Sequence, residues 1–251
     1  MSQSKKHTDL YKIEPIVTFN DVRQGMEEFW ITPKNGNKFR LGIWDYDTMY
    51  KNPFLYDIIY NDIVKLDAPK GLTGYFLELM HQHDPKTKLR ILDLAAGSGL
   101  SAIQLKNSGK IELIIGVDIL ESAREAAFRD HPGVYDDYYV LNFETLSIKQ
   151  INNFKEYKFN CFFVTSGTGG GDDDSDYNDV MLKAYIQAIE LMEPNSYIVF
   201  NIREKHTSGQ ELILNYLDSC CNCVGKKITV FRQLINGVKF NAEYVVMQLK
   251  K

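Results

Sequence analysis

Short apolar runs and longer stretches with helical spacing alternate along the chain from residue 90 onward. The apolar runs are rich in β-branched and aromatic residues, which favours strands, and they occur at 90–94, 112–118, 138–141, 160–165, 196–202, 228–233 and 243–249. The helical stretches lie at 100–107, 121–129, 148–154, 179–192 and 209–219. Strands that alternate with helices in this way predict a parallel sheet covered by crossover helices.

The last two predicted strands are joined by a tight turn rather than by a helix. Residues 235–238 read Ile-Asn-Gly-Val, and an Asn-Gly pair between apolar residues is a strong signal for a β-hairpin. We therefore predict an α/β fold with a seven-stranded sheet whose last pair of strands is antiparallel. A typical dinucleotide-binding fold is instead parallel out to its edge.

Residues 1–89 carry a different pattern, in which aromatic side chains are dense and Gly and Pro interrupt the sequence. Helical spacing occurs at 56–64 and 70–81. The aromatic residues are too numerous to leave in water and too few to build a core of their own. We therefore expect residues 1–55 to form a helical, aromatic-rich cap over the mouth of the sheet, and residues 56–251 to form the main domain.

The charge and composition of the chain bear on whether it binds nucleic acid or a membrane. The chain of 251 residues has a formal net charge of −4 and a pI near 5.8, so no overall basic field attracts nucleic acid or an anionic membrane. No apolar stretch approaches the roughly 18 residues of a membrane span, and the basic N-terminus lacks the apolar region of a signal peptide. We expect a cytoplasmic protein, either a monomer or a homodimer, that binds neither nucleic acid nor membrane.

The four cysteines lie at Cys161, in an apolar run, and close together at Cys220, Cys221 and Cys223. A secreted disulfide framework spreads its cysteines through the chain. A zinc site usually shows two separated pairs of ligands, or histidines that complete the set. We therefore expect reduced thiols and no metal site.

The most informative segment follows the first predicted strand of the main domain. It reads Ala-Ala-Gly-Ser-Gly over 95–99 and leads directly into a helix. Small residues allow a tight turn and the close approach of a ligand, and a helix N-terminus presents free N–H groups to a carboxylate or phosphate. Residues 97–102 also satisfy G-x-G-x-x-A, a pattern of nicotinamide dinucleotide enzymes.

Two acidic residues help to distinguish a pyrophosphate-containing ligand from one that carries an ammonium group. Asp93 lies inside the strand, four residues before Gly97, where a carboxylate repels a pyrophosphate but receives an ammonium group such as that of methionine. Asp118 ends the next strand, 21 positions after Gly97, and an acid there accepts hydrogen bonds from ribose hydroxyls. Ile119 would lie beside an adenine. The alternatives are that Asp93 is a buried, hydrogen-bonded acid and Asp118 a turn residue.

Residues 91–99, Ile-Leu-Asp-Leu-Ala-Ala-Gly-Ser-Gly, resemble motif I of class I S-adenosylmethionine (SAM)-dependent methyltransferases, and Gly-Val-Asp-Ile at 116–119 resembles the acidic motif after their second strand. The chain from about 56 to 204 is further similar to methyltransferase-like proteins of the Williams–Beuren-region type. The similar pieces are Tyr-Asn-Asp at 60–62, Glu-Pro-Asn at 193–195 and Phe-Asn-Ile-Arg-Glu at 200–204. The resemblance implies a Rossmann-like fold, SAM as cofactor and methyl transfer as activity.

Carried over by position, the resemblance implies that Asp93 and the glycine loop hold the methionine part of the cofactor and Asp118 the ribose. Asn142 and Phe143 would border the adenine. The predicted cofactor contacts are Asp93, Ala95, Gly97, Ser98, Gly99, Asp118, Ile119, Asn142, Phe143 and Thr165. The chain departs from the family pattern at Ala95, where many members have glycine, and at Asn142, where an aspartate often contacts the adenine amine.

Methyl transfer is an in-line displacement that needs alignment and, for an amine or phenol, a base. The catalytic candidates are Tyr60 in the N-terminal layer and Glu204 and His206 after the fifth strand, because loops at the carboxyl ends of strands carry such groups. The acidic stretch 172–176 is either a solvated loop or a lid that attracts cations. We predict a SAM-dependent methyltransferase of a small, neutral or cationic molecule with an N, O or S nucleophile. The alternatives are an NAD(P)-dependent oxidoreductase and a non-catalytic SAM-binding protein.

Overall fold

The computed structural model describes residues 9–16, 25–165, 175–204, 206–233 and 235–250. Its main sheet has seven strands in the order β6-β5-β4-β7-β8-β10-β9. Their bounds are β4 (Leu89–Leu94), β5 (Ile111–Asp118), β6 (Asp137–Val140), β7 (Phe159–Val164), β8 (Met192–Arg203), β9 (Cys221–Gln233) and β10 (Lys239–Leu249). Strands β4 to β8 pair in parallel, and β10 runs antiparallel to both β8 and β9. The predicted α/β sheet with an antiparallel last pair is confirmed.

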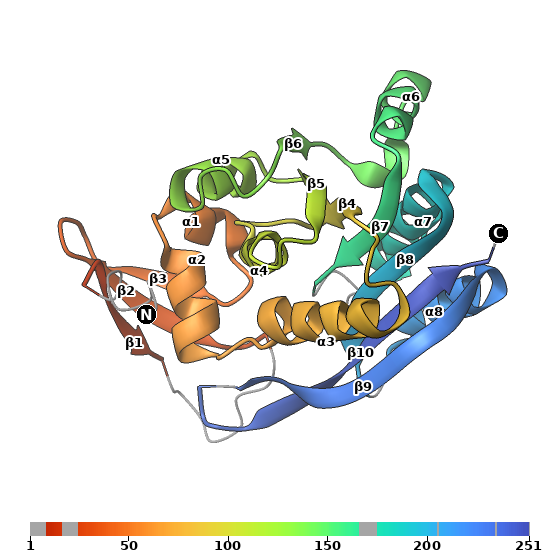
Figure 1. Ribbon diagram of the computed structural model, residues 1–251. Coiled ribbons are helices and arrows are strands. Elements are labelled where there is room, and N and C mark those ends of the chain that lie inside the picture. The colour runs from red at the N-terminus through yellow and green to blue at the C-terminus, as the bar shows by residue number, and fades with distance from the viewer. Residues whose placement is uncertain (1–8, 17–24, 166–174, 205, 234, 251) are drawn as a thin grey trace.

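Helices cover both faces of this sheet (Figure 1). They are α3 (Ala68–His83), α4 (Leu100–Lys106), α5 (Glu121–Asp130), α6 (Ile148–Glu156), α7 (Ser175–Glu190), α8 (Ser208–Cys220) and the short 3-10 helix η3 (Phe143–Thr145). Capping boxes begin α6, at Ser147 with Gln150, and α8, at Thr207 with Gln210, so the sequence itself fixes where these two helices start.

The core has two layers because successive strand residues point to opposite faces. Neighbouring residues of β7 illustrate this: Phe163 belongs to the cluster that includes Phe76 of α3, whereas Phe162 belongs to the cluster that includes Tyr185 of α7. Both phenylalanines are fully buried. Burial on both faces explains why the parallel strands read as continuous apolar runs in the sequence.

The N-terminal layer contains a small sheet that the sequence did not predict. Strands β1 (Tyr11–Pro15), β2 (Glu28–Pro33) and β3 (Phe39–Gly42) form an antiparallel sheet, followed by α1 (Tyr46–Lys51), α2 (Leu55–Asp57) and the π-helix η2 (Ile58–Ile63). The helices expected at 56–64 and 70–81 are present, but the expectation of a purely helical cap is wrong. In β2 the buried Phe29 and Ile31 flank the exposed Trp30, an alternation that the aromatic density of the region obscured.

The N-terminal layer packs onto the main sheet through one continuous hydrophobic cluster, in which Phe29, Ile31 and Leu41 join Ile91 of β4. Polar contacts anchor it further to α5 and the segment that follows. They are Ser122 Oγ to Asp47 (2.8 Å), Arg129 to the Tyr50 carbonyl (2.9 Å), the Phe54 N–H to Asp130 (3.0 Å) and His131 with Asp57 (2.6 Å). Figure 1 shows α1 and α2 beside α5 and α4 at the mouth of the sheet. Among the described helices, none is long and apolar enough to span a bilayer.

Candidate cofactor site

The loop between β4 and α4 makes a compact turn at the carboxyl edge of the sheet. Ala95, Gly97 and Gly99 all have positive φ, at 56°, 54° and 95°. Glycine adopts this region without steric cost, whereas an L-alanine is strained there. Three left-handed residues within five positions make this loop a tight turn.

Asp118 ties this loop to the end of β5. Its Oδ2 accepts a hydrogen bond from the Gly97 N–H at 3.0 Å, and its Oδ1 accepts one from the Leu120 N–H at 3.0 Å. Burial raises the pKa of Asp118, and these backbone bonds oppose the rise. The next residue, Ile119, leaves 69% of its surface exposed. The site therefore presents a carboxylate beside an uncovered apolar surface.

Asp93 lies beneath the loop and is almost completely buried, with 1% exposure. The Tyr135 hydroxyl donates to its Oδ2 at 2.8 Å, and burial raises the pKa of Asp93 to about 7. Tyr138 donates to the Gly97 carbonyl at 2.9 Å. Tyr135, from the segment between α5 and β6, and Tyr138, from β6 itself, thus support the loop, a role that the sequence did not predict.

Two glycines make room for these tyrosines. A Cβ on Gly116 would lie 2.7 Å from the Tyr138 ring, and one on Gly99 would lie 3.1 Å from the Tyr135 ring. A contact of 2.7 Å is shorter than packed carbon atoms allow, and one of 3.1 Å is tighter than most, so a side chain at either position would force its neighbour to shift.

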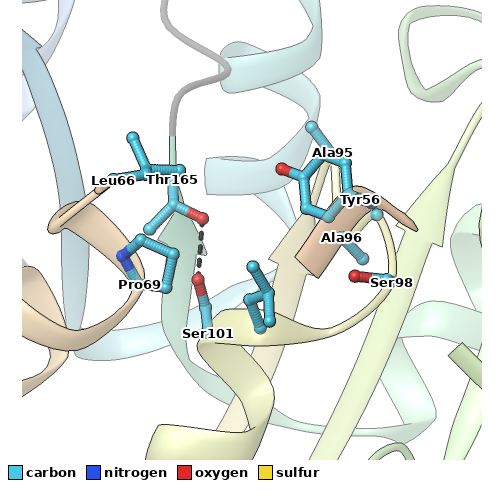
Figure 2. Close-up of a pocket in the computed structure, with 10 residues that line it drawn as sticks. Tyr56, Leu66, Pro69, Ala95, Ala96, Ser98, Ser101 and Thr165 are labelled. Atoms are coloured by element: carbon cyan, nitrogen blue, oxygen red, sulfur yellow. Dashed lines mark hydrogen bonds between the residues drawn. The ribbon is translucent and has the colours of Figure 1, made fainter. Parts of the chain in front are cut away.

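A small pocket opens beside the loop, with a volume of about 30 Å³ (Figure 2). Its lining consists of the loop residues from Ala95 to Ser98, Leu100 and Ser101 of α4, and Tyr56, Leu66, Pro69 and Thr165; in Figure 2, Tyr56 lies beside Ala95 and Ala96, opposite Leu66 and Pro69. The hydroxyls of Ser101 and Thr165 lie 2.8 Å apart across it. The pocket is therefore small and carries both hydroxyl and apolar groups.

Four tyrosines of the N-terminal layer, namely Tyr46, Tyr50, Tyr56 and Tyr60, form one aromatic cluster, and two of them, Tyr50 and Tyr56, lie beside the loop. The rings of Tyr56 and Tyr60 have centroids 4.5 Å apart, and those of Tyr50 and Tyr56 are 4.9 Å apart. The Tyr50 hydroxyl lies so close to Gly97 that a Cβ there would be 2.5 Å away. Burial raises the pKa of Tyr50, Tyr56 and Tyr60, so these hydroxyls stay protonated.

A contact missed by the sequence analysis links the layer to the loop through Asp57. The Ser98 hydroxyl donates to Asp57 Oδ1 at 3.2 Å, and His131 Nε2 lies 2.6 Å from Oδ2. Ser98 is 1% exposed and also lines the pocket. Asp57 follows Tyr56 directly, so the same turn supplies a wall of the pocket and a support for the loop.

The predicted catalytic candidates lie outside this pocket. The Tyr60 hydroxyl is buried and donates to the Ile43 carbonyl at 2.8 Å. Glu204 accepts from Asn241 at 3.0 Å, and His206 lies 3.7 Å from Glu243, so both contact β10. None of the three lines the pocket.

The predicted cofactor residues are brought together in part. Ala95, Gly97, Ser98 and Thr165 line the pocket. Asn142 instead caps η3 by accepting from the Glu144 N–H, and the Phe143 ring packs against Phe154 in the core. The acidic stretch 172–174 lies outside the described residues.

Comparisons with known proteins agree on the architecture. No family model matches the sequence, and no curated protein matches it. Among solved structures, the N-methyltransferase NodS from Bradyrhizobium japonicum WM9, in complex with S-adenosyl-L-homocysteine, superposes with a TM-score of 0.58 at 10% identity, over 82% of this chain and 97% of NodS. A SAM-dependent methyltransferase from Methanosarcina mazei gives 0.52 at 14% identity, over 68% of this chain and 97% of that one.

A third structure, the proposed RNA methyltransferase PH1948 from Pyrococcus horikoshii, gives a TM-score of 0.52 at 10% identity, over 71% of this chain and 83% of that one. The chain therefore has the Rossmann-like α/β fold that these methyltransferases share. At such low identities the similarity establishes the fold, and the function is argued from the site itself.

Proposed function

We propose that the protein is a SAM-dependent methyltransferase that acts on a small molecule. The observation that carries the proposal is the bond between Asp118 at the end of β5 and the Gly97 N–H of the tight loop after β4. This hydrogen bond joins the two features that the motif resemblance identified, the acidic residue after the second strand and the glycine loop. The proposed similarity to the Williams–Beuren-region type rests on the short sequence pieces alone.

The chemistry of the site suits SAM. A carboxylate has about four acceptor positions, so Asp118 can hold its two backbone N–H groups and still accept from ribose hydroxyls. The adenine ring of SAM would cover Ile119 and so remove its exposed apolar surface from water. An ammonium group near the loop would supply a positive charge to Asp93, whose pKa burial has raised.

In the proposed complex, the loop Ala95–Gly99 and Asp93 would hold the methionine part, and Asp118 the ribose. When bound, SAM supplies an activated methyl group that a nucleophile displaces in line. Ser101 and Thr165 are two of the hydroxyl groups that line the pocket, and they would orient the acceptor there. The protonated tyrosines of the covering layer would exclude water rather than act as bases.

A small, neutral or cationic acceptor with an N, O or S nucleophile is the substrate class that we propose. The fold does not decide this, because one similar structure is a proposed RNA methyltransferase. The net charge of −4 argues against a polyanion, since nucleic-acid enzymes generally need a basic track for the phosphates. The apolar wall of Leu66 and Pro69 beside the two hydroxyls suits a compact molecule.

Asp93 opposes the first of the two alternative functions. An NAD(P)-dependent oxidoreductase would place a pyrophosphate near the loop, where the carboxyl of Asp93 lies directly below. A non-catalytic SAM-binding protein would use the same cofactor contacts without turnover.

A methyl-acceptor screen tests the proposed activity. Purified protein with labelled SAM is incubated with pools of small amines, phenols, thiols and carboxylates, and separately with RNA. We expect methyl transfer to a member of the small-molecule pools, and the Asp118→Ala variant should lose it. The control variant is Glu112→Gln, which removes an exposed acid from the same strand and should keep full turnover. Transfer to RNA alone would contradict the proposed acceptor class, and SAM binding without transfer to any pool would favour the non-catalytic alternative.

A further inference from the structure

Two adjacent cysteines meet at the junction of α8 and β9. Cys220 ends the helix and Cys221 begins the strand, with no loop between them. Within a strand, successive side chains point to opposite faces. The change from helix to strand at this peptide instead brings the two Sγ atoms to 3.7 Å. The junction thus creates a pair of thiols in contact.

This pair lies far from the cofactor loop. Cys221 pairs with Leu249, and the neighbouring Gln248 pairs with Tyr197 near the beginning of β8. The thiols are therefore at the amino edge of the parallel strands, whereas the loop is at their carboxyl edge. The pair has no part in the proposed methyl transfer.

The two thiols differ in access. Cys221 is 3% exposed and packs in the core cluster of α7 and α8, whereas Cys220 is half-buried. Cys220 Sγ lies 3.4 Å from the Tyr216 carbonyl and 3.7 Å from the Leu217 carbonyl. A ligand from solvent would therefore bind the Cys220 sulfur first and the Cys221 sulfur second.

Charged groups around the pair come from the helix end and from the strand after it. The Lys250 N–H donates to the Cys220 carbonyl, and its ammonium donates to the Asp218 carbonyl at 2.9 Å. Burial raises the pKa of Cys221 to about 12; the Cys220 thiol and the Asp218 carboxylate add to the rise, and Lys250 opposes it. At neutral pH Cys221 is a thiol, so a ligand must displace its proton.

We propose that Cys220 and Cys221 form a two-thiol chelating site for a trivalent arsenical. The 3.7 Å between the two sulfurs places both within reach of a single soft centre. An ion that requires three or more ligands does not suit the site, since the described residues contain no such group of His, Cys, Asp and Glu. A soft centre that is satisfied by two thiolates does suit it.

The binding step is balanced without an oxidant. An organoarsenic(III) oxide reacts with both thiols to form two As–S bonds, and the oxide oxygen leaves as water with the two thiol protons. Arsenic remains trivalent and the sulfurs are not oxidised. Once one bond has formed, the second thiol reacts intramolecularly, which strengthens binding by orders of magnitude over a single thiol.

The test uses the full chain with one equivalent of phenylarsine oxide, in the presence of excess monothiol. Intact-mass measurement should show one phenylarsenic group per chain. Cys220→Ser should weaken the retained adduct by ~100-fold, because a single thiol does not chelate. The matched control, Cys223→Ser, removes an exposed thiol of the same strand and should bind as the wild type does. Unchanged retention in Cys220→Ser, or loss of retention in Cys223→Ser, would overturn the proposal.

A second measurement avoids substitutions altogether. The wild-type adduct is treated with N-ethylmaleimide, and the modified cysteines are located by fragmentation. Protection of Cys220 with continued labelling of Cys223 supports the site. Labelling of Cys220 in the adduct contradicts it. Neither result depends on whether the protein is a methyltransferase.

Discussion

At the scale of single residues, the cofactor loop contains one residue in an unfavourable conformation. Ala95 has a φ of 56°, and an L-residue in the left-handed region costs roughly 1–2 kcal/mol. Ala95→Gly should therefore raise the free energy of unfolding by about 1 kcal/mol, offset in part by the greater chain entropy of glycine. Urea denaturation measures this. Ala96→Gly is the control and should lower stability, because Ala96 has no positive φ to relieve.

Asp93 makes stability depend on pH in an unusual direction. Its pKa is about 7 in the folded protein and about 3.9 in an unfolded chain. The folded state thus holds the proton more tightly, and stability falls as pH rises from about 4 to about 7. Asp93→Asn should remove this part of the decline, on the order of 4 kcal/mol at most. Denaturant unfolding of both proteins at pH 5 and pH 8 gives the change in the free energy of unfolding between the two pH values. An equal change in wild type and Asp93→Asn would contradict the burial of Asp93 as its cause.

Asp118 is the residue whose loss should affect cofactor binding most specifically. Asp118→Ala should weaken SAM binding by ~1–3 kcal/mol, the size expected for lost hydrogen bonds to a charged acceptor. The half-buried position of Asp118 at the end of β5 leaves the core intact, so the fold should persist. Calorimetric titration measures the change, and an unchanged affinity in a folded variant would remove Asp118 from the site.

At the scale of elements, a buried ion pair joins the N-terminal layer to the edge of the main sheet. Glu27, which precedes β2, bonds Arg232 of β9, and they are 0% and 3% exposed. Burial lowers the pKa of Arg232 to about 10, and its Nε has no partner among the described residues. Glu27→Met should cost ~3–5 kcal/mol because it leaves a buried charge unpaired. The double variant Glu27→Met/Arg232→Met should recover most of that loss in a denaturant titration, and no recovery would show that the charges themselves are needed.

The elements of the main sheet were predictable because parallel strands buried on both faces leave continuous apolar runs. The three N-terminal strands were not, since their aromatic residues hid an alternation of period two. In the site, the glycine loop and Asp118 follow from local spacing. Tyr135 and Asp57 contact the loop from 39 and 41 residues away in sequence, and no local pattern encodes such contacts. Glu204 and His206 were placed by strand position alone, which does not determine that they contact β10.

At the scale of the whole molecule, the N-terminal layer borders the proposed cofactor site. Tyr56 lines the pocket, and the Tyr50 hydroxyl lies against Gly97 of the loop. The layer also shares its hydrophobic cluster with β4. Removal of residues 1–51 should therefore abolish turnover and also lower the melting temperature. A truncated protein with full activity would contradict the covering role.

The central claim is that the site binds SAM, and thermal unfolding with ligands tests it most directly. A ligand that binds only the folded state raises the melting temperature as its concentration rises. SAM and S-adenosyl-L-homocysteine should both raise it, and the shift should shrink in Asp118→Ala but not in Glu112→Gln. NAD and NADP should leave it unchanged. A shift with NAD and none with SAM would contradict the account.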